Sequence, residues 1–116
     1  MPRVKRGVVS RRKHKKLLSQ TKGFRGTKRK LVKVAHEAVL HSGEYAFHGR
    51  KLKKRDFRAL WITRISEAVK KEGLSYSVFI DKLKKQNIDL DRKMLHEILL
   101  NDPKAFKSLI DNLQGS

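Results

Sequence analysis

Apolar residues recur with helical spacing in the second half of the chain, beginning at Phe57. The first set consists of Phe57, Leu60, Trp61, Ile65, Ala68 and Val69. These positions fall on one face of a single helix, so we interpret that face, including Phe57 and Trp61, as part of a hydrophobic core. Gly73 follows the set and is expected to end the helix, because glycine tolerates the left-handed conformation found just after helix C-termini.

Three shorter helices are predicted next, each beginning at a residue that suits an N-cap. Ser75 and Asp91 precede two apolar sets, and Asp102 followed by Pro103 forms an N-cap and N1 pair. Asn87 is expected to end the first of the three. The inward faces would carry Phe79, Ile80 and Leu83, then Met94, Leu95, Ile98 and Leu99, then Phe106, Leu109, Ile110 and Leu113. Because no stretch alternates apolar and polar residues, the sequence predicts an all-α protein.

The first half also has helical spacing, but its apolar stripe is narrow. The stripe consists of Leu31, Val34, Ala35, Ala38 and Val39, with Lys and Arg around it. We expect one side to pack lightly, on a long helix from about Lys28 to Gly73 that would measure roughly 65 to 70 Å. Gly43 and Gly49 lie inside this stretch. Each weakens a helix by about 1 kcal/mol relative to Ala, so we expect a bend or break between them.

Charge divides the chain into two unlike halves. The 116 residues have a formal net charge of +19. Residues 1–58 hold 20 Lys and Arg against three acids, whereas residues 59–116 hold ten against eight. A segment so charged and so poor in apolar residues cannot offset the conformational entropy of ordering. We therefore predict that residues 1–58 form a long basic helical N-terminal extension, kinked and disordered without RNA, and that residues 59–116 form a small globular helical domain.

An anionic partner follows from this charge. At an isoelectric point near 10.7, nucleic acid is the leading candidate, because Lys and Arg displace counterions from phosphates. The longest apolar run is Ala59 to Ile62, far short of the roughly 18 to 20 residues needed to cross a bilayer. The basic helices lack the broad apolar face of a membrane-surface helix, and the basic start lacks the apolar segment of a signal peptide. We expect no membrane partner, although an Arg-rich, acid-free start also resembles an organelle transit peptide.

The sequence offers no residues for catalysis, a cofactor or a metal. His41, Glu44 and His48 lie at i, i+3 and i+7, but the chain has no cysteine and Gly43 interrupts the helix that the ligand geometry would need. No Ser, His and Asp arrangement and no phosphate-binding glycine-rich loop is recognisable. We predict that the protein is not an enzyme and needs no cofactor.

Four basic clusters carry the functional prediction. They run from Arg3 to Arg6, Arg11 to Lys16, Lys28 to Lys33 and Arg50 to Arg58, and Asp56 is the only acid within them. Solvated faces usually mix both signs, and an unbroken excess repels itself unless phosphates neutralise it. The residues predicted to contact RNA are Arg3, Lys5, Arg6, Arg11, Arg12, Lys13, His14, Lys15, Lys16, Lys22, Phe24, Arg25, Lys28, Arg29, Lys30, Lys33, Arg50, Lys51, Lys53, Lys54, Arg55, Arg58, Arg92 and Lys93.

Two of these predictions rest on more than charge. Aromatic rings among basic residues can stack on unpaired bases, and Phe24 lies between Gly23 and Arg25 in an expected turn, where stacking on RNA and packing within the protein are equally reasonable. Arg92 and Lys93 stand at the start of a predicted helix, where cations oppose the helix dipole. Contact with RNA is one reason for placing them there.

Taken together, these residues resemble the family of large-subunit ribosomal protein twenty, found in bacteria and plastids. The resemblance runs from near Pro2 to about Leu113. It rests on Arg3-Val4-Lys5-Arg6-Gly7, His14-Lys15-Lys16, Lys22-Gly23-Phe24-Arg25-Gly26, Tyr45-Ala46-Phe47, Lys54-Arg55-Asp56-Phe57-Arg58, Leu60-Trp61-Ile62, Ser75-Tyr76-Ser77 and Asp91-Arg92-Lys93. Each motif alone is weak, but their order and spacing are specific.

The resemblance implies a structural constituent of the large ribosomal subunit in the cytoplasm of a bacterium, or in a plastid. It implies a basic extension threaded into large-subunit ribosomal RNA, contacts with neighbouring large-subunit proteins, and a role in early subunit assembly. In some bacteria the family also represses translation of its own messenger RNA, which makes that messenger a further candidate partner. The alternative is a helical DNA-binding protein, but residues 59–116 offer no strongly basic helix for a DNA groove.

Overall fold

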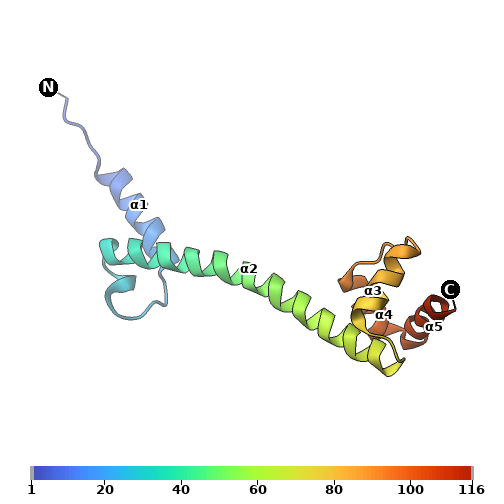
Figure 1. Ribbon diagram of the computed structural model, residues 1–116. Helices are drawn as coiled ribbons and strands as arrows, with labels where there is room; N and C mark the ends of the chain where they lie inside the picture. The colour runs from blue at the N-terminus through green and yellow to red at the C-terminus, as the bar shows by residue number, and fades with distance from the viewer. Residues whose placement is uncertain (1, 116) are drawn as a thin grey trace. The chain divides into compact units, whose positions relative to one another are not determined.

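The computed structural model describes residues 2–115, and helices are the only regular structure within them. The elements are α1 (Gly7–Gln20), the 3₁₀ helix η1 (Gly26–Arg29), α2 (Val32–Lys71), α3 (Tyr76–Lys85), α4 (Arg92–Asn101) and α5 (Pro103–Gln114) (Figure 1). The all-α prediction is confirmed. The chain divides into two compact units, Met1–Lys51 (the first unit) and Leu52–Ser116 (the second unit).

Helix α2 corrects one prediction from the sequence. It is 40 residues long and continues through both Gly43 and Gly49, so the break expected between them is wrong. The helix also begins at Val32, four residues later than expected, because η1 precedes it. The penalty of about 1 kcal/mol at each glycine is local, and the hydrogen bonds of the 40-residue helix together outweigh the two penalties.

The first unit has little interior. Helix α1, for which the apolar spacing predicted no separate helix, has no buried residue and no side-chain cap. Among residues 2–51 only Thr21 and Ala35 are buried, and the Thr21 hydroxyl donates to the Leu18 carbonyl at 3.2 Å. The rest of the predicted stripe is half-buried, except Leu31, which is 54% exposed. The stripe packs lightly, as its narrowness indicated.

Three N-caps in the second unit are confirmed. Side-chain oxygens of Ser75, Asp91 and Asp102 accept hydrogen bonds from the backbone amide three residues further on, at 3.4, 2.8 and 3.0 Å. Pro103 occupies the first turn of α5, where its missing amide hydrogen costs nothing. These short sequence signals therefore fix where α3, α4 and α5 begin.

Helices α2 and α3 end in the same way. Gly73 has φ 83° and Asn87 has φ 53°, both in the left-handed region. In each case the next residue is apolar, and its amide reaches back over the last turn to a buried residue. These bonds run from Leu74 to the Val69 carbonyl at 3.2 Å and from Ile88 to the Leu83 carbonyl at 3.0 Å.

The core of the second unit gathers side chains from four helices. It comprises Ile65 and Val69 of α2, Phe79 and Leu83 of α3, Leu95 of α4, and Phe106, Ile110 and Leu113 of α5. The rings of Phe79 and Phe106 lie 6.0 Å apart between centroids. Trp61 is half-buried and packs against this core, as predicted.

Two residues placed in the core by periodicity are exposed. Phe57 is 44% exposed and Met94 is 49% exposed, so their assignment as core residues is wrong. Phe57 stacks on Trp61 with ring centroids 6.2 Å apart, and it lies about two turns before Ile65, the first buried residue of the core. Periodicity identifies the face of a helix, but neighbouring helices decide how far along that face burial extends.

Candidate nucleic-acid interface

The N-terminal basic clusters are open to solvent along their whole length. Arg3, Lys5 and Arg6 precede α1, and the cluster from Arg11 to Lys16 occupies its middle. Every one of these side chains is exposed. Since residues 1–36 contain no Asp or Glu, no carboxylate in this stretch offsets their charge.

A tight turn between α1 and α2 presents the next cations. Gly23 and Gly26 have φ of 88° and 63°, and a Cβ at either position would meet nothing within 4 Å. Glycine is therefore needed for the backbone conformation and not for space. The Phe24 amide donates to the Thr21 carbonyl at 3.0 Å, and the Phe24 ring is half-buried. The exposed cations around the turn are Lys22, Arg25, Lys28, Arg29, Lys30 and Lys33.

The fourth cluster lies along the middle of α2, across the division between the two units. Arg50 and Lys51 belong to the first unit. In the second unit, the exposed cations of the cluster are Lys53, Lys54, Arg55 and Arg58. No side chain between residues 40 and 60 is buried or half-buried, so this stretch of α2 offers its full circumference to a partner.

Exposed aromatic rings stand among these cations. Tyr45 and Phe47 are 75% and 56% exposed, although neither was in the predicted contact set. Lys51 Nζ lies 4.6 Å from the centre of the Phe47 ring, and Lys53 Nζ lies 5.8 Å from that of Phe57. A ring with an adjacent cation can stack on an unpaired base while the cation binds phosphate. The position of these two rings just before the basic cluster at Arg50 to Arg58 was the sequence signal that should have added Tyr45 and Phe47.

Arg92 and Lys93 open α4, directly after the N-cap Asp91. Arg92 is half-buried, and its Nε atom is buried without a hydrogen-bond partner among the described residues. Lys93 is exposed and lies 3.9 Å from Glu97. A cation at a helix N-terminus and an unsatisfied guanidinium nitrogen are both unfavourable in isolation, and a nearby anion would offset both.

Arg64 is a surface cation that the sequence analysis missed. It is exposed on α2, and its Nη1 donates to Nε2 of His96 at 2.9 Å. His96 is buried on α4. Because guanidinium has no acceptor, the imidazole Nε2 must accept, which holds the Arg64 head group in place. The two residues are 32 positions apart, and no local pattern connects them.

The described part of the chain contains neither a metal-ligand cluster nor a membrane-spanning helix. Residues 2–115 contain no group of three His, Cys, Asp or Glu side chains placed to hold a metal ion. His41 Nδ1 lies 3.9 Å from a Glu44 oxygen, on the exposed surface of α2. None of the described helices is long and apolar enough to cross a membrane.

Comparison with known proteins matches this chain along nearly its whole length. The family model described as ribosomal protein L20 matches residues 3–109. A protein of Erythrobacter litoralis (strain HTCC2594) named "Large ribosomal subunit protein bL20" is 50% identical over 116 residues, which cover 100% of this chain and 98% of that protein. Proteins of the same name are 48% identical in Bordetella petrii, over 100% of this chain and 98% of that protein, and 50% identical in Leptothrix cholodnii, over 99% and 98%.

Proposed function

Because the chain belongs to the ribosomal protein L20 family, whose members are structural proteins of the large ribosomal subunit and not enzymes, we propose that it binds large-subunit ribosomal RNA directly. The expected place of the protein is the ribosome in the bacterial cytoplasm, since the relatives compared are bacterial. The contact set is the one predicted from the sequence, with Tyr45 and Phe47 added.

Full exposure of the acid-free N-terminal clusters is the observation that carries the proposal. Such a surface gains most of its binding free energy by releasing counterions from phosphates. Exposed rings beside cations at Phe47 and Phe57 suit unpaired RNA bases better than the edges of a DNA groove. Structured RNA therefore fits these exposed basic clusters better than duplex DNA does.

Salt dependence tests the proposal. If about ten phosphates are neutralised, log K for a large-subunit RNA fragment should fall against log salt with a slope of about −7 to −9. Fluorescence titration of the full chain at several salt concentrations measures this slope. A slope shallower than about −2 would contradict phosphate-driven binding.

A role in early subunit assembly extends the proposal. A segment that buries few side chains gains order when it binds, so the N-terminal extension and the RNA it contacts would become ordered in the same step. Depletion of the protein in cells should accumulate incomplete large-subunit particles that lack it. Normal particle profiles under depletion would limit the function to a late structural contact.

The protein's own messenger RNA is a second candidate partner, suggested by Arg92 and Lys93 on the compact second unit. These cations are separate from the N-terminal extension, so they could bind an RNA that makes no contact with the extension. A reporter fused to the protein's own leader should be repressed when the protein is overproduced. An Arg92→Ala variant should repress it less, and an unchanged response would remove this candidate.

A further inference from the structure

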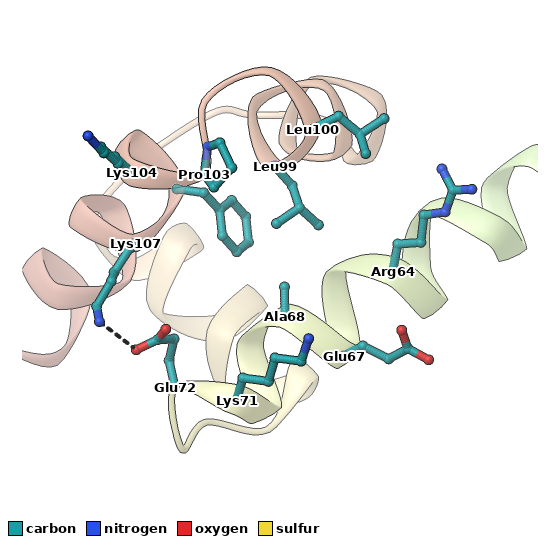
Figure 2. A pocket seen from close by; sticks show the side chains of 11 residues that line it. Arg64, Glu67, Ala68, Lys71, Glu72, Leu99, Leu100, Pro103, Lys104 and Lys107 are labelled. Atoms are coloured by element: carbon teal, nitrogen blue, oxygen red, sulfur yellow. Dashed lines mark ion pairs between the residues drawn. The ribbon is translucent and has the colours of Figure 1, made fainter.

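A groove on the second unit lies outside the predicted RNA contacts. It has a volume of about 550 Å³ and lies between the last turns of α2 and the junction of α4 and α5 (Figure 2). Its walls belong to elements far apart in the sequence. The end of α5 is tied to its neighbours by hydrogen bonds from Gln114 Nε2 to the Glu72 carbonyl at 3.0 Å and from Lys82 Nζ to the Leu113 carbonyl at 2.6 Å.

The floor of the groove is apolar. Ala68 and Leu99 face each other across it, and Pro103 lies beside Leu99 (Figure 2). Phe106 also lines the floor, but it is only 3% exposed because its ring belongs to the core. Leu100, at the edge of the groove, is 57% exposed. A large apolar side chain from a partner would cover Leu100 and Leu99 without disturbing the core.

The rim of the groove is charged, with cations in excess. It carries Arg64, Lys71, Lys104 and Lys107 against Glu67 and Glu72. Lys107 is engaged with Glu72, at 3.7 Å. Within residues 2–115, the side-chain amines of Lys71 and Lys104 have no ion-pair or hydrogen-bond partner, and the Arg64 guanidinium donates to His96 and keeps its positive charge. The groove therefore combines an apolar floor with unneutralised cations.

These features favour a protein segment over RNA as the occupant. The one aromatic ring in the lining is buried, so it cannot stack on a base as Tyr45 or Phe47 can. Two carboxylates stand among the cations of the rim, in contrast to residues 1–36, which contain none. Apolar floors with a charged rim and arginine are typical of protein interfaces.

We propose that this groove docks a peptide segment of a neighbouring protein, one with a large aliphatic side chain flanked by carboxylates. The aliphatic side chain lies on Leu99 and Leu100, and the carboxylates pair with Lys71 and Lys104. The inference rests on the proposed function only in assigning the segment to a protein of the large subunit. The groove itself stands on its own geometry.

The test uses the purified full chain and a synthetic peptide with a central photoreactive leucine between glutamates. Illumination should crosslink the peptide to α4 and α5 around Leu100, as mapped by mass spectrometry. Leu100→Asp should weaken peptide binding about tenfold, as expected for loss of an apolar anchor. Met94→Asp is the matched control, because Met94 is a similarly exposed apolar residue of α4 that does not line this groove.

Several outcomes would overturn the proposal. Crosslinks confined to residues 3–58 would mean that the peptide binds only the basic clusters by charge. An equal loss of binding in Leu100→Asp and Met94→Asp would mean that the groove has no special role. If Leu100→Asp weakened ribosomal RNA binding as much as peptide binding, the groove would be an RNA contact instead. Failure of the unmodified chain to bind ribosomal RNA would count against the proposed function, and the crosslinking result would be unaffected by it.

Discussion

Both units of this protein are helical, but the second has a hydrophobic core and the first has an exposed basic surface. The second unit buries side chains from four helices in one core. The first buries only Thr21 and Ala35 among its described residues, while its cations stand exposed. A core supplies stability from within, whereas an exposed surface with excess positive charge gains stability when an anionic partner neutralises it. We therefore predict that the second unit folds alone and that the first gains order when it binds its partner.

Helix α2 shows the same contrast between exposed and buried side chains within a single helix. Up to Lys51 its only buried residue is Ala35, and from Leu52 onward it contributes Ile65 and Val69 to the core. From residue 40 to residue 60 all its side chains are exposed. The same backbone structure therefore serves two purposes, and side-chain chemistry alone separates them.

Separating the units should have the largest effect. A fragment of residues 59–116 should fold alone and melt cooperatively, since it keeps all eight core residues. Its stability will be marginal at this size. A fragment of residues 1–58 should be mostly unstructured in low salt and gain helix on adding an RNA fragment. Circular dichroism of each fragment, with and without RNA, measures both outcomes.

The position of the cut sharpens this prediction. The boundary expected from charge lies at residue 58, and the compact units divide between Lys51 and Leu52. Residues 52–58 are all exposed, so a fragment of residues 52–116 should be as stable as the shorter one to within about 1 kcal/mol. Two results would contradict the predicted difference between the units. One is a stable helix in residues 1–58 alone, and the other is the absence of a cooperative transition in both C-terminal fragments, 59–116 and 52–116.

Removing cations should weaken RNA binding at predicted contact residues and not at cations outside the contact set. The double variant Lys15→Ala and Lys16→Ala in α1 should weaken ribosomal RNA binding about 30-fold near physiological salt, because two phosphate contacts are lost. The control removes the same charge at Lys70 and Lys71, near the end of α2, and should change affinity less than about threefold. Equal losses would show that total charge matters and position does not. Filter binding at fixed salt distinguishes the two results.

The smallest expected effect is the loss of a helix cap in the second unit. Asp102→Ala removes the acceptor for the Ala105 amide and should lower the free energy of unfolding by about 1 kcal/mol. That corresponds to a fall in Tm of about 4–8 °C for a domain of this size. Asp89→Ala, an exposed aspartate that caps no helix, is the control and should change stability by less than about 0.5 kcal/mol. A Tm unchanged in Asp102→Ala would mean that the cap contributes nothing to folding.

The sequence predicted most of the helix ends and the residues available for RNA. Ser75, Asp91 and Asp102 were identified as caps because an N-cap bonds to an amide only three residues away, so its signal is local. Gly73 and Asn87 were identified as stops for the same reason. Charge is also a property of the sequence alone. The candidate contact residues of the first 33 positions could therefore be named, and the structure finds all of them exposed except the half-buried ring of Phe24.

The sequence-based predictions that were wrong, or that could not be made, concern features that depend on the sum of many interactions or on residues far apart in the chain. The helix continues through Gly43 and Gly49 because hydrogen bonds along a long helix outweigh two local penalties. Helical spacing placed Phe57 and Met94 on inward faces, but whether a face is covered depends on helices elsewhere in the chain. The bond between Arg64 and His96 spans 32 positions, and the groove beside it is formed by α2, α4 and α5 together. Charge, caps and helix faces were thus set by the sequence itself, whereas burial and the groove were decided only when packing brought distant residues into contact.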